Sequence, residues 1–221
     1  MNKIAIVIGA TGLVGRALVD QLADADHVSK VITLTRCSAK HSSSKIINQV
    51  VDFEHLEDYA SLFNADLLFS CLGTTFKQPG SIAAQRKVDL DYQFKAAQLA
   101  VCNGVNHYLL VSSSGANDKS NSPYLKMKGE LEQKIQSLPF KHISIFQPSL
   151  LIGQRADFRF WEKLGSLVVP VLCLIPWLRR FRPIAGKQVA AKMVQVSRQP
   201  GPPVQWFRLD EIFINKNSIT K

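Results

Sequence analysis

The sequence predicts an α/β protein with a Rossmann fold, a doubly wound parallel sheet with helices on both faces. Three observations lead there. An apolar β-prone run at residues 4–8 ends in glycines spaced three apart. Helical spacing begins directly after those glycines, at residues 13–22. Further apolar runs then alternate with helical stretches, and the 221 residues suit a single domain, residues 1–221.

Composition limits the ligand class. Lys plus Arg outnumber Asp plus Glu by 27 to 17, and the net charge of +10 favours anionic ligands. No nucleic-acid recognition motif accompanies this charge, so no nucleic-acid partner is expected. The four cysteines, Cys37, Cys71, Cys102 and Cys173, lack metal-site spacing. They are interpreted as reduced thiols, and no metal is expected in what we predict to be a cytoplasmic protein.

One apolar segment departs from this pattern. Residues 164–178 are uncharged, but the stretch includes Pro170 and Pro176 and is too short to span a bilayer. A buried helix and loop is the simpler interpretation, and peripheral membrane contact is the alternative. We expect the segment to pack over the substrate end of the site or into a subunit contact, in a monomer or a homodimer.

The glycine turn is the first chemical motif. Gly9 permits a tight turn, Gly12 allows a pyrophosphate to approach the backbone, and Gly15 allows the following helix to pack closely on the strand. The amino end of that helix would then face the phosphates. The GxxGxxG spacing differs from the GxGxxG of many dehydrogenases, and a purely structural turn is the alternative.

The second strand, residues 30–34, is followed by Arg36. A carboxylate near this position binds the ribose hydroxyls of NAD, whereas an arginine accommodates a 2′-phosphate. The sequence therefore favours NADP as the cofactor, with NAD possible. The alternative is a solvated surface arginine.

Two further strand ends carry candidate cofactor contacts. Asp52 and Phe53 follow a strand at residues 45–51, where an adenine contact is expected. The strand at residues 65–71 runs into Gly73, which suits a loop under a bound cofactor.

The rest of the chain continues the alternation of helices and strands. The expected elements are a helix at residues 81–103 ended by a glycine cap, strands at 107–111 and 141–146, a helix at 189–196 and a strand at 204–209.

Tyr124 and Lys128 form the second chemical motif. They lie four residues apart in a helical stretch, so both side chains point from one helix face. A lysine ammonium beside a phenol stabilises the phenolate, which makes tyrosine a usable proton donor or acceptor. A serine hydroxyl from the end of the strand at 107–111 could hold a substrate oxygen against it.

Six segments, GATGLVG, SCLGTT, VDLDYQFKAAQLA, LLVSSSGA, YLKMKGELE and QPSLLIG, occur in this order. Together they resemble the short-chain dehydrogenase/reductase superfamily, in particular its atypical NAD(P)-binding branch similar to the Tat-interactive protein. The resemblance covers residues 3–193. It implies that Tyr124 is the acid/base, that Lys128 grips the nicotinamide ribose, and that Ser114 or else Ser113 is the serine partner.

The same resemblance implies a cofactor site. It places Gly9, Thr11, Gly12, Leu13 and Val14 at the pyrophosphate, Arg36, Leu72 and Gly73 at the adenosine, and Pro148, Ser149, Leu150 and Leu151 at the nicotinamide face. The expected cofactor site also includes Gly15, Asp52, Phe53, Ser112, Tyr124 and Lys128.

Residues 152–221 would form the substrate or partner side. Basic and aromatic residues gather there, and they suit either an anionic substrate or a solvated rim: Arg155, Arg159, Trp161, Trp177, Arg179, Arg180 and Arg182.

Two positions depart from the superfamily pattern. Asp89 stands where many members carry an asparagine, and Gln147 stands where related sequences often have arginine. Two hypotheses follow. The first is an NADP-dependent oxidoreductase that acts on a carbonyl or hydroxyl carbon of a small-molecule substrate. The second is a catalytically silent NADP(H)-sensing module that binds a protein partner.

Overall fold

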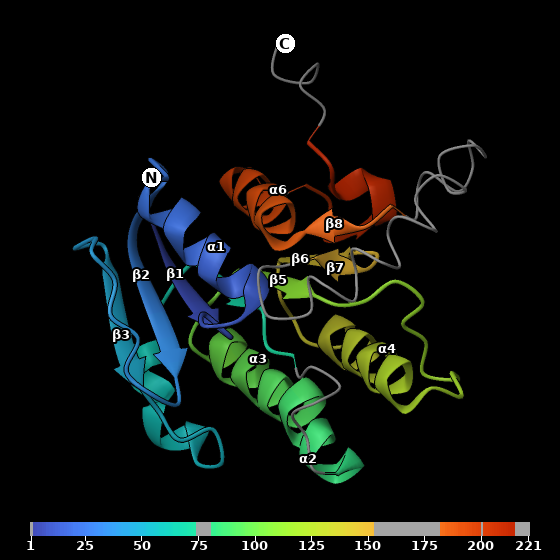
Figure 1. The fold of residues 1–221 in the computed structure, drawn as a ribbon. Helices are drawn as coiled ribbons and strands as arrows, with labels where there is room; N and C mark the ends of the chain where they lie inside the picture. Colours follow the sequence, from blue (N-terminus) through green and yellow to red (C-terminus); the bar gives the residue numbers. More distant parts are fainter. Residues whose placement is uncertain (1, 74–80, 153–181, 200, 215–221) are drawn as a thin grey trace.

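The computed structural model describes residues 2–73, 81–152, 182–199 and 201–214. A seven-stranded sheet has the order β3-β2-β1-β4-β5-β6-β9. Every neighbouring pair is parallel, and the arrowheads of β1, β2 and β3 point the same way in Figure 1. The strands are β1 (Lys3–Ile8), β2 (Val28–Thr35), β3 (Ile46–Val50), β4 (Leu67–Ser70), β5 (His107–Val111), β6 (His142–Gln147) and β9 (Val204–Arg208). The fold is the predicted Rossmann arrangement.

Helices cover both faces of the sheet (Figure 1). α1 (Leu13–Ala23) and α6 (Gly186–Arg198) lie on one face, and α3 (Tyr92–Cys102) and α4 (Pro123–Gln136) lie on the other. Each helix buries an apolar stripe against the strands, so the molecule has two hydrophobic clusters with the sheet between them.

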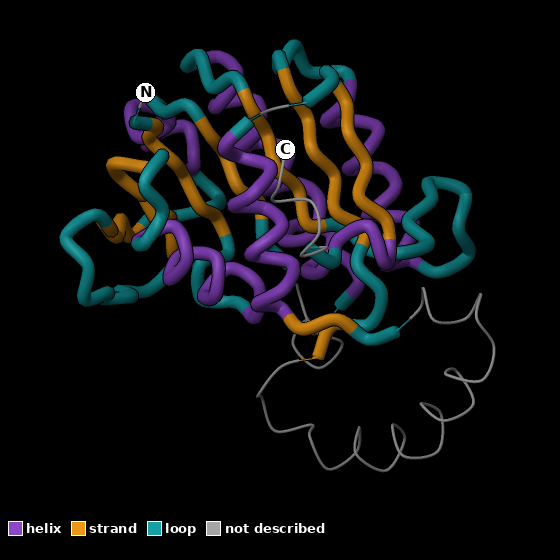
Figure 2. The backbone as a smooth tube through the Cα atoms, turned by 90° about the horizontal axis from the view of Figure 1, so that it is seen from above, coloured by secondary structure: helices purple, strands orange, loops and turns teal. Residues whose placement is uncertain are grey.

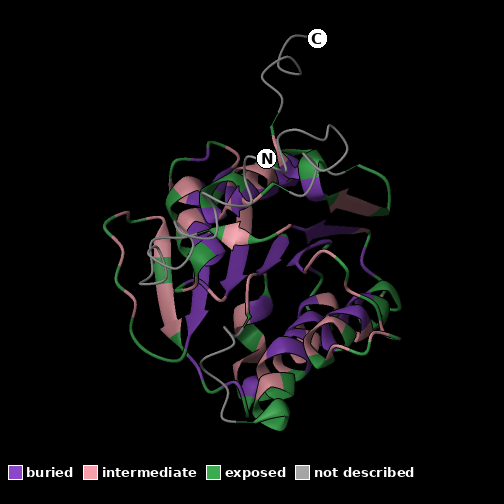
Figure 3. Ribbon diagram, turned by 45° about the vertical axis from the view of Figure 1, so that its right-hand side comes forward, coloured by how far each residue is buried: buried purple, intermediate pink, exposed green. Residues whose placement is uncertain are grey.

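β1 shows why its apolar run is continuous. Ala5 and Val7 belong to the cluster under α1 and α6, whereas Ile6 and Ile8 belong to the cluster under α3 and α4. Because both faces of a central parallel strand are covered, its residues do not alternate between apolar and polar. Figure 3 shows the central strands as buried ribbons, and the edge strand β3 is only partly buried. Each large apolar side chain buried this way stabilises the fold by about 1.5–3 kcal/mol.

The predicted helix at residues 81–103 is interrupted. α2 (Ile82–Arg86) passes through a π-helical segment (Lys87–Asp91) into α3. The wider turn rotates the helix, so Asp89, Leu90 and Gln93 are buried, while Val88 and Tyr92 are only half-buried.

Gln93 ties this segment to the sheet. Its amide donates to the carbonyls of Asp89, at 2.8 Å, and Val88, at 3.3 Å. Its Oε1 accepts from the hydroxyl of Ser70 at the end of β4, at 2.7 Å. π turns occur frequently at functional sites, and this one lies next to the carboxyl end of β4.

The smaller elements were not predicted. A short parallel pair, β7 (Leu151–Ile152) with β8 (Ile184–Ala185), lies apart from the main strands in Figure 2. 3₁₀ turns occur at η1 (Leu56–Phe63) and η4 (Leu209–Ile212). No helix in the described part of the chain is long and apolar enough to cross a membrane.

Several residues discussed from the sequence lie outside the described residues. They are the apolar segment 164–178 and, from the basic and aromatic group, Arg155, Arg159, Trp161, Trp177, Arg179 and Arg180. Arg182 is described, and its guanidinium carbon lies 3.6 Å from the ring centroid of Phe213.

Candidate functional site

The loops that follow β1 and β4 meet at the point where the strand order reverses. Gly9 has φ +77°, and a Cβ there would lie 2.4 Å from the carbonyl carbon of Cys71 and 2.5 Å from the nitrogen of Leu72. Backbone conformation and lack of space both require glycine at this position. In open α/β sheets this crevice is where ligands bind.

The other two glycines keep α1 close to the turn. A Cβ on Gly15 would lie 2.1 Å from the carbonyl oxygen of Gly9, whereas one on Gly12 would lie 3.2 Å from the same atom. Gly12 is the N-cap of α1, and that helix has no side-chain cap and no acidic residue in its first turn. An anion can therefore approach the helix terminus without meeting a carboxylate of the cap or first turn.

The remaining residues of the turn have different surroundings. Thr11 and Leu13 are exposed, and Leu13 also packs closely on Gly186 at the start of α6. Val14 is buried in the core under α1, so only its backbone is available to a ligand.

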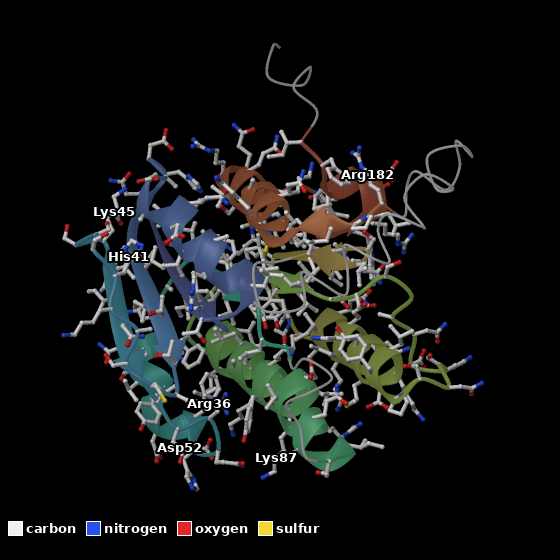
Figure 4. The ribbon with its side chains drawn as sticks, viewed as in Figure 1. Arg36, His41, Lys45, Asp52, Lys87 and Arg182 are labelled. Atoms are coloured by element: carbon white, nitrogen blue, oxygen red, sulfur yellow. The ribbon has the colours of Figure 1, made fainter. Side chains whose placement is uncertain are left out.

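Arg36 and Asp52 follow β2 and β3 at the carboxyl edge of the sheet, and both are exposed (Figure 4). Phe53, by contrast, is buried, and its ring centroid lies 5.7 Å from that of Tyr92 on α3. The Asp52 carboxylate accepts a hydrogen bond from the nitrogen of Glu54 at 2.9 Å.

A polar cluster around Tyr92 was missed from the sequence. Its hydroxyl donates to Oε1 of Glu54 at 2.5 Å, and Lys87 pairs with the same oxygen at 2.7 Å. Burial and this carboxylate raise the pKa of Tyr92 to about 12, against an opposing effect of the Arg36 charge. This edge of the sheet therefore holds charges of both signs, after β2, in the loop after β3 and on the π-helical segment before α3.

The predicted pair on α4 is close in space. The Lys128 ammonium lies 5.9 Å from the ring centroid of Tyr124 and 3.5 Å from the carbonyl oxygen of Leu72. Leu72 is the residue whose nitrogen adjoins Gly9. The contact between Lys128 and Leu72 thus brings this part of α4 close to the glycine turn, although the two segments are far apart in the chain.

Lys128 also has a carboxylate partner. Oδ1 of Asp89, in the π-helical segment, lies 3.1 Å from its ammonium nitrogen. The sequence marked Asp89 only as a departure from asparagine, and nothing in local spacing pointed to this contact. The oxygen also lies 3.6 Å from where a Cβ on Gly73 would be, so Asp89 borders the loop after β4.

The three serines after β5 differ in their surroundings. Ser112 is buried and its hydroxyl donates to Glu132 on α4. Ser113 and Ser114 are half-buried, and the Ser114 nitrogen donates to the carbonyl of Pro148 at 2.9 Å. This places the two candidate serine partners beside the loop after β6.

The loop after β6 forms the next wall. Pro148 is buried, Leu150 is exposed and Leu151 is half-buried. The Ser149 hydroxyl donates to the carbonyl of Arg182 at 2.5 Å, which ties this loop to the segment before β8.

Comparisons with known proteins agree with this geometry. The chain matches the family described as NAD(P)H-binding over residues 9–151. Protein HTATIP2 of Rattus norvegicus is 37% identical over 168 residues, covering 74% of this chain and 69% of that protein. Protein FMP52, mitochondrial, of Saccharomyces cerevisiae is 34% identical over 188 residues, covering 83% of this chain and 80% of that protein.

Solved structures share the fold at low identity. MoeE5 in complex with UDP-glucuronic acid and NAD has a TM-score of 0.71 at 15% identity, covering 93% of this chain and 75% of that one. A short-chain dehydrogenase/reductase superfamily protein from Agrobacterium tumefaciens with bound NAD has a TM-score of 0.67 at 14% identity, covering 93% and 77%.

Proposed function

Since this chain belongs to the NAD(P)H-binding family and to the atypical short-chain dehydrogenases/reductases, we propose that it is an NADP-dependent oxidoreductase acting on a carbonyl or hydroxyl carbon. The observation that carries the proposal is the position of Lys128. Its ammonium contacts the carbonyl of Leu72 beside the glycine turn, and the Tyr124 ring lies next to it. Lys128 therefore links Tyr124, which would transfer the proton, to the loop beside the glycine turn.

The crevice fits a dinucleotide in three respects. The glycine turn has no room for side chains at Gly9 and Gly15, the amino end of α1 has no side-chain cap, and Arg36 offers a guanidinium at the end of β2. The turn and the helix terminus would hold the pyrophosphate, and Leu72 and Gly73 would lie along the adenosine half. When bound, the nicotinamide supplies or accepts a hydride.

Tyr124 would exchange the proton with the substrate oxygen, and Ser114, or else Ser113, would hold that oxygen in place. Lys128 would bind the nicotinamide ribose. Its position is already set by Asp89 and by the Leu72 carbonyl, so its side-chain conformation would change little on binding.

We propose NADP rather than NAD because the residue after β2 is Arg36 and not a carboxylate. A guanidinium can donate two parallel hydrogen bonds to a phosphate. Two nearby carboxylates, Asp52 and Glu54, would oppose a 2′-phosphate. Lys87 and Tyr92 bind Oε1 of Glu54, so Glu54 competes little with the Arg36 charge.

One observation favours the second candidate function, a silent NADP(H)-sensing module with a protein partner. The Lys128 ammonium pairs with the Asp89 carboxylate at 3.1 Å, so Tyr124 is not its only neighbour. We propose a cytoplasmic location for either function. The FMP52 relatives are named as mitochondrial proteins, so fractionation of cells that express the tagged chain tests this part.

The decisive experiment starts from purified protein. NADPH binding is measured by nicotinamide fluorescence, and a panel of aldehydes and ketones is then screened for NADPH oxidation. The oxidoreductase proposal expects binding and turnover of at least one carbonyl class. Binding without turnover across the panel would favour the sensing module, and no binding of either nicotinamide cofactor would contradict both candidates.

A further inference from the structure

Glu132 is a buried carboxyl group that the proposed chemistry does not use. It lies on α4, one helical turn beyond Lys128, and only 4% of its surface is exposed. Burial raises the pKa of Glu132, while hydrogen bonds from Ser112 and Gln147 and the charges of Lys128 and Arg208 oppose this shift. A carboxyl group in this position is costly to bury, so its hydrogen-bond partners indicate what it does there.

The two donors to Glu132 come from neighbouring strand ends. Both the Ser112 hydroxyl and the Gln147 amide donate to the same oxygen, Oε1, the amide at 2.9 Å. β5 and β6 pair up to Val111 and Phe146, so these donors are the next residues of each strand. Glu132 therefore joins the ends of β5 and β6 from the α4 side of the sheet.

The connection continues to the last strand. Gln147 pairs in register with Arg208 of β9, and Nε of Arg208 donates to Oε1 of Gln147 at 3.3 Å. The Arg208 backbone nitrogen in turn donates to Glu211 at 2.8 Å. The residue after Arg208, Leu209, has φ +51°, a conformation that is uncommon for a branched residue. Arg208 therefore connects the end of β9 to Gln147 at the end of β6.

The loops of the candidate site that follow β5 and β6 begin at Ser112 and Gln147. Ser112 precedes Ser113 and Ser114, and Gln147 precedes Pro148. The loops are also joined to each other, because the Ser114 nitrogen donates to the Pro148 carbonyl at 2.9 Å. A movement of either strand end would therefore move both walls around the substrate oxygen.

We propose that Glu132 is a positioning residue. Through Ser112 and Gln147 it fixes the loop after β5, residues 112–116, relative to the loop after β6, residues 147–151. It does not touch substrate or cofactor. The expected effect of Glu132 on turnover rests on the proposed function. The expected effect of Glu132 on the order of the two loops does not.

The test compares Glu132→Met, which removes the acceptor, with Glu132→Gln, which keeps an acceptor oxygen. Glu130→Gln is the matched control, because Glu130 lies on the same helix and pairs with Arg86 at 2.7 Å, away from the strand ends. Amide hydrogen exchange is measured for the segments 112–116 and 147–151, with β2 as the reference segment. Ser112→Ala is the second variant, since it removes one donor and leaves Glu132 in place.

We expect Glu132→Met to speed exchange in both segments by about tenfold or more, the range for loss of a hydrogen bond to a charged group. Ser112→Ala should affect mainly residues 112–116. Glu130→Gln should stay within about twofold of the native protein, and Glu132→Gln, whose amide oxygen is a weaker acceptor, should fall between it and Glu132→Met. With an identified carbonyl substrate, Glu132→Met should lower kcat by a similar factor and leave the NADPH dissociation constant nearly unchanged.

Equal exchange in native and Glu132→Met protein would overturn the proposal, as would acceleration of equal size in β2. If Glu132→Met does not fold, unchanged exchange at 112–116 in Ser112→Ala would overturn it. Failure of every carbonyl screen would refute the enzymatic function and leave the exchange result interpretable.

Discussion

The ammonium of Lys128 lies 3.1 Å from Oδ1 of Asp89, and the two side chains are only 2% and 0% exposed. One residue comes from α4 and the other from the π-helical segment before α3. This contact anchors the proposed ribose-binding lysine to the helix that borders the loop after β4. Removing one partner of a buried ion pair costs about 3–5 kcal/mol, because a charge stays buried without its counterion.

Asp89→Leu should therefore lower the free energy of unfolding by about 3–5 kcal/mol in urea titrations. Asp89→Asn should cost less, since the amide oxygen still accepts from Lys128. The double variant Asp89→Leu/Lys128→Met should recover much of the loss, because neither charge of the pair stays buried without its partner. A loss of under about 1 kcal/mol for Asp89→Leu would show that the pair does not stabilise the fold.

Tyr124→Phe should reduce carbonyl turnover at least about a hundredfold, the lower range for a positioned acid/base. NADPH affinity should change little, because the glycine turn and Arg36 would carry cofactor binding. Steady-state kinetics and fluorescence titration measure the two effects separately. Tyr59→Phe, on η1, is the control, and full activity in Tyr124→Phe would mean that another group moves the proton.

Arg36→Asp should reverse the cofactor preference. The native protein should bind NADPH more tightly than NADH by about tenfold to a hundredfold, the range for hydrogen bonds to a charged group. The variant should prefer NADH, because a carboxylate repels the 2′-phosphate. Calorimetry on both cofactors gives the ratio. Lys141→Asp makes the same charge change at the amino end of β6, and an equal effect there would mean that only net charge matters.

Gly15→Ala should destabilise the protein by about 1–3 kcal/mol or more and weaken NADPH binding. Its Cβ would lie 2.1 Å from the carbonyl oxygen of Gly9, so α1 and the turn must separate. Gly104→Ala is the control, because Gly104 has φ +85° and a Cβ added there would meet no atom of the described residues within 4 Å. That variant should lose stability through strain alone and keep its cofactor affinity; equal affinity losses in the two variants would contradict the prediction.

Burial, with smaller effects of the His142 and Lys3 charges, lowers the pKa of His107 to about 3. An unfolded histidine titrates near about 6.5, so below that pH the unfolded chain takes up a proton that the folded protein does not. The stabilising effect is therefore complete above pH about 6.5 and is lost as the pH falls towards 3, at about 1.4 kcal/mol per pH unit.

His107→Gln should remove this dependence. Between pH about 7 and about 5, the native protein should lose about 2 kcal/mol more in unfolding free energy than the variant does. Urea titrations at both pH values measure the difference. His55→Gln, at an exposed position, should follow the native protein, and an equal pH dependence in His107→Gln would refute the assignment.

The sequence by itself determined the parts that depend on local pattern. The apolar run of β1, covered on both faces, and the spacing of Gly9, Gly12 and Gly15 were sufficient for the strand, the turn and the helix. The pair of Tyr124 and Lys128 followed from the helical repeat alone, because residues four apart share a face. The family resemblance rested on the same short segments.

Only the tertiary structure decided which distant groups meet. Asp89 reaches Lys128 because a π turn rotates it inward, and regular helical spacing does not predict such a turn. In the sequence, Glu132 is marked only by its spacing, because it follows Tyr124 and Lys128 at four-residue intervals on the same helix face. Its partners Ser112 and Gln147 lie at the ends of strands that become neighbours only when the sheet forms. Hydrophobic periodicity specifies which face of an element is buried, whereas polar contacts depend on packing between elements far apart in the chain.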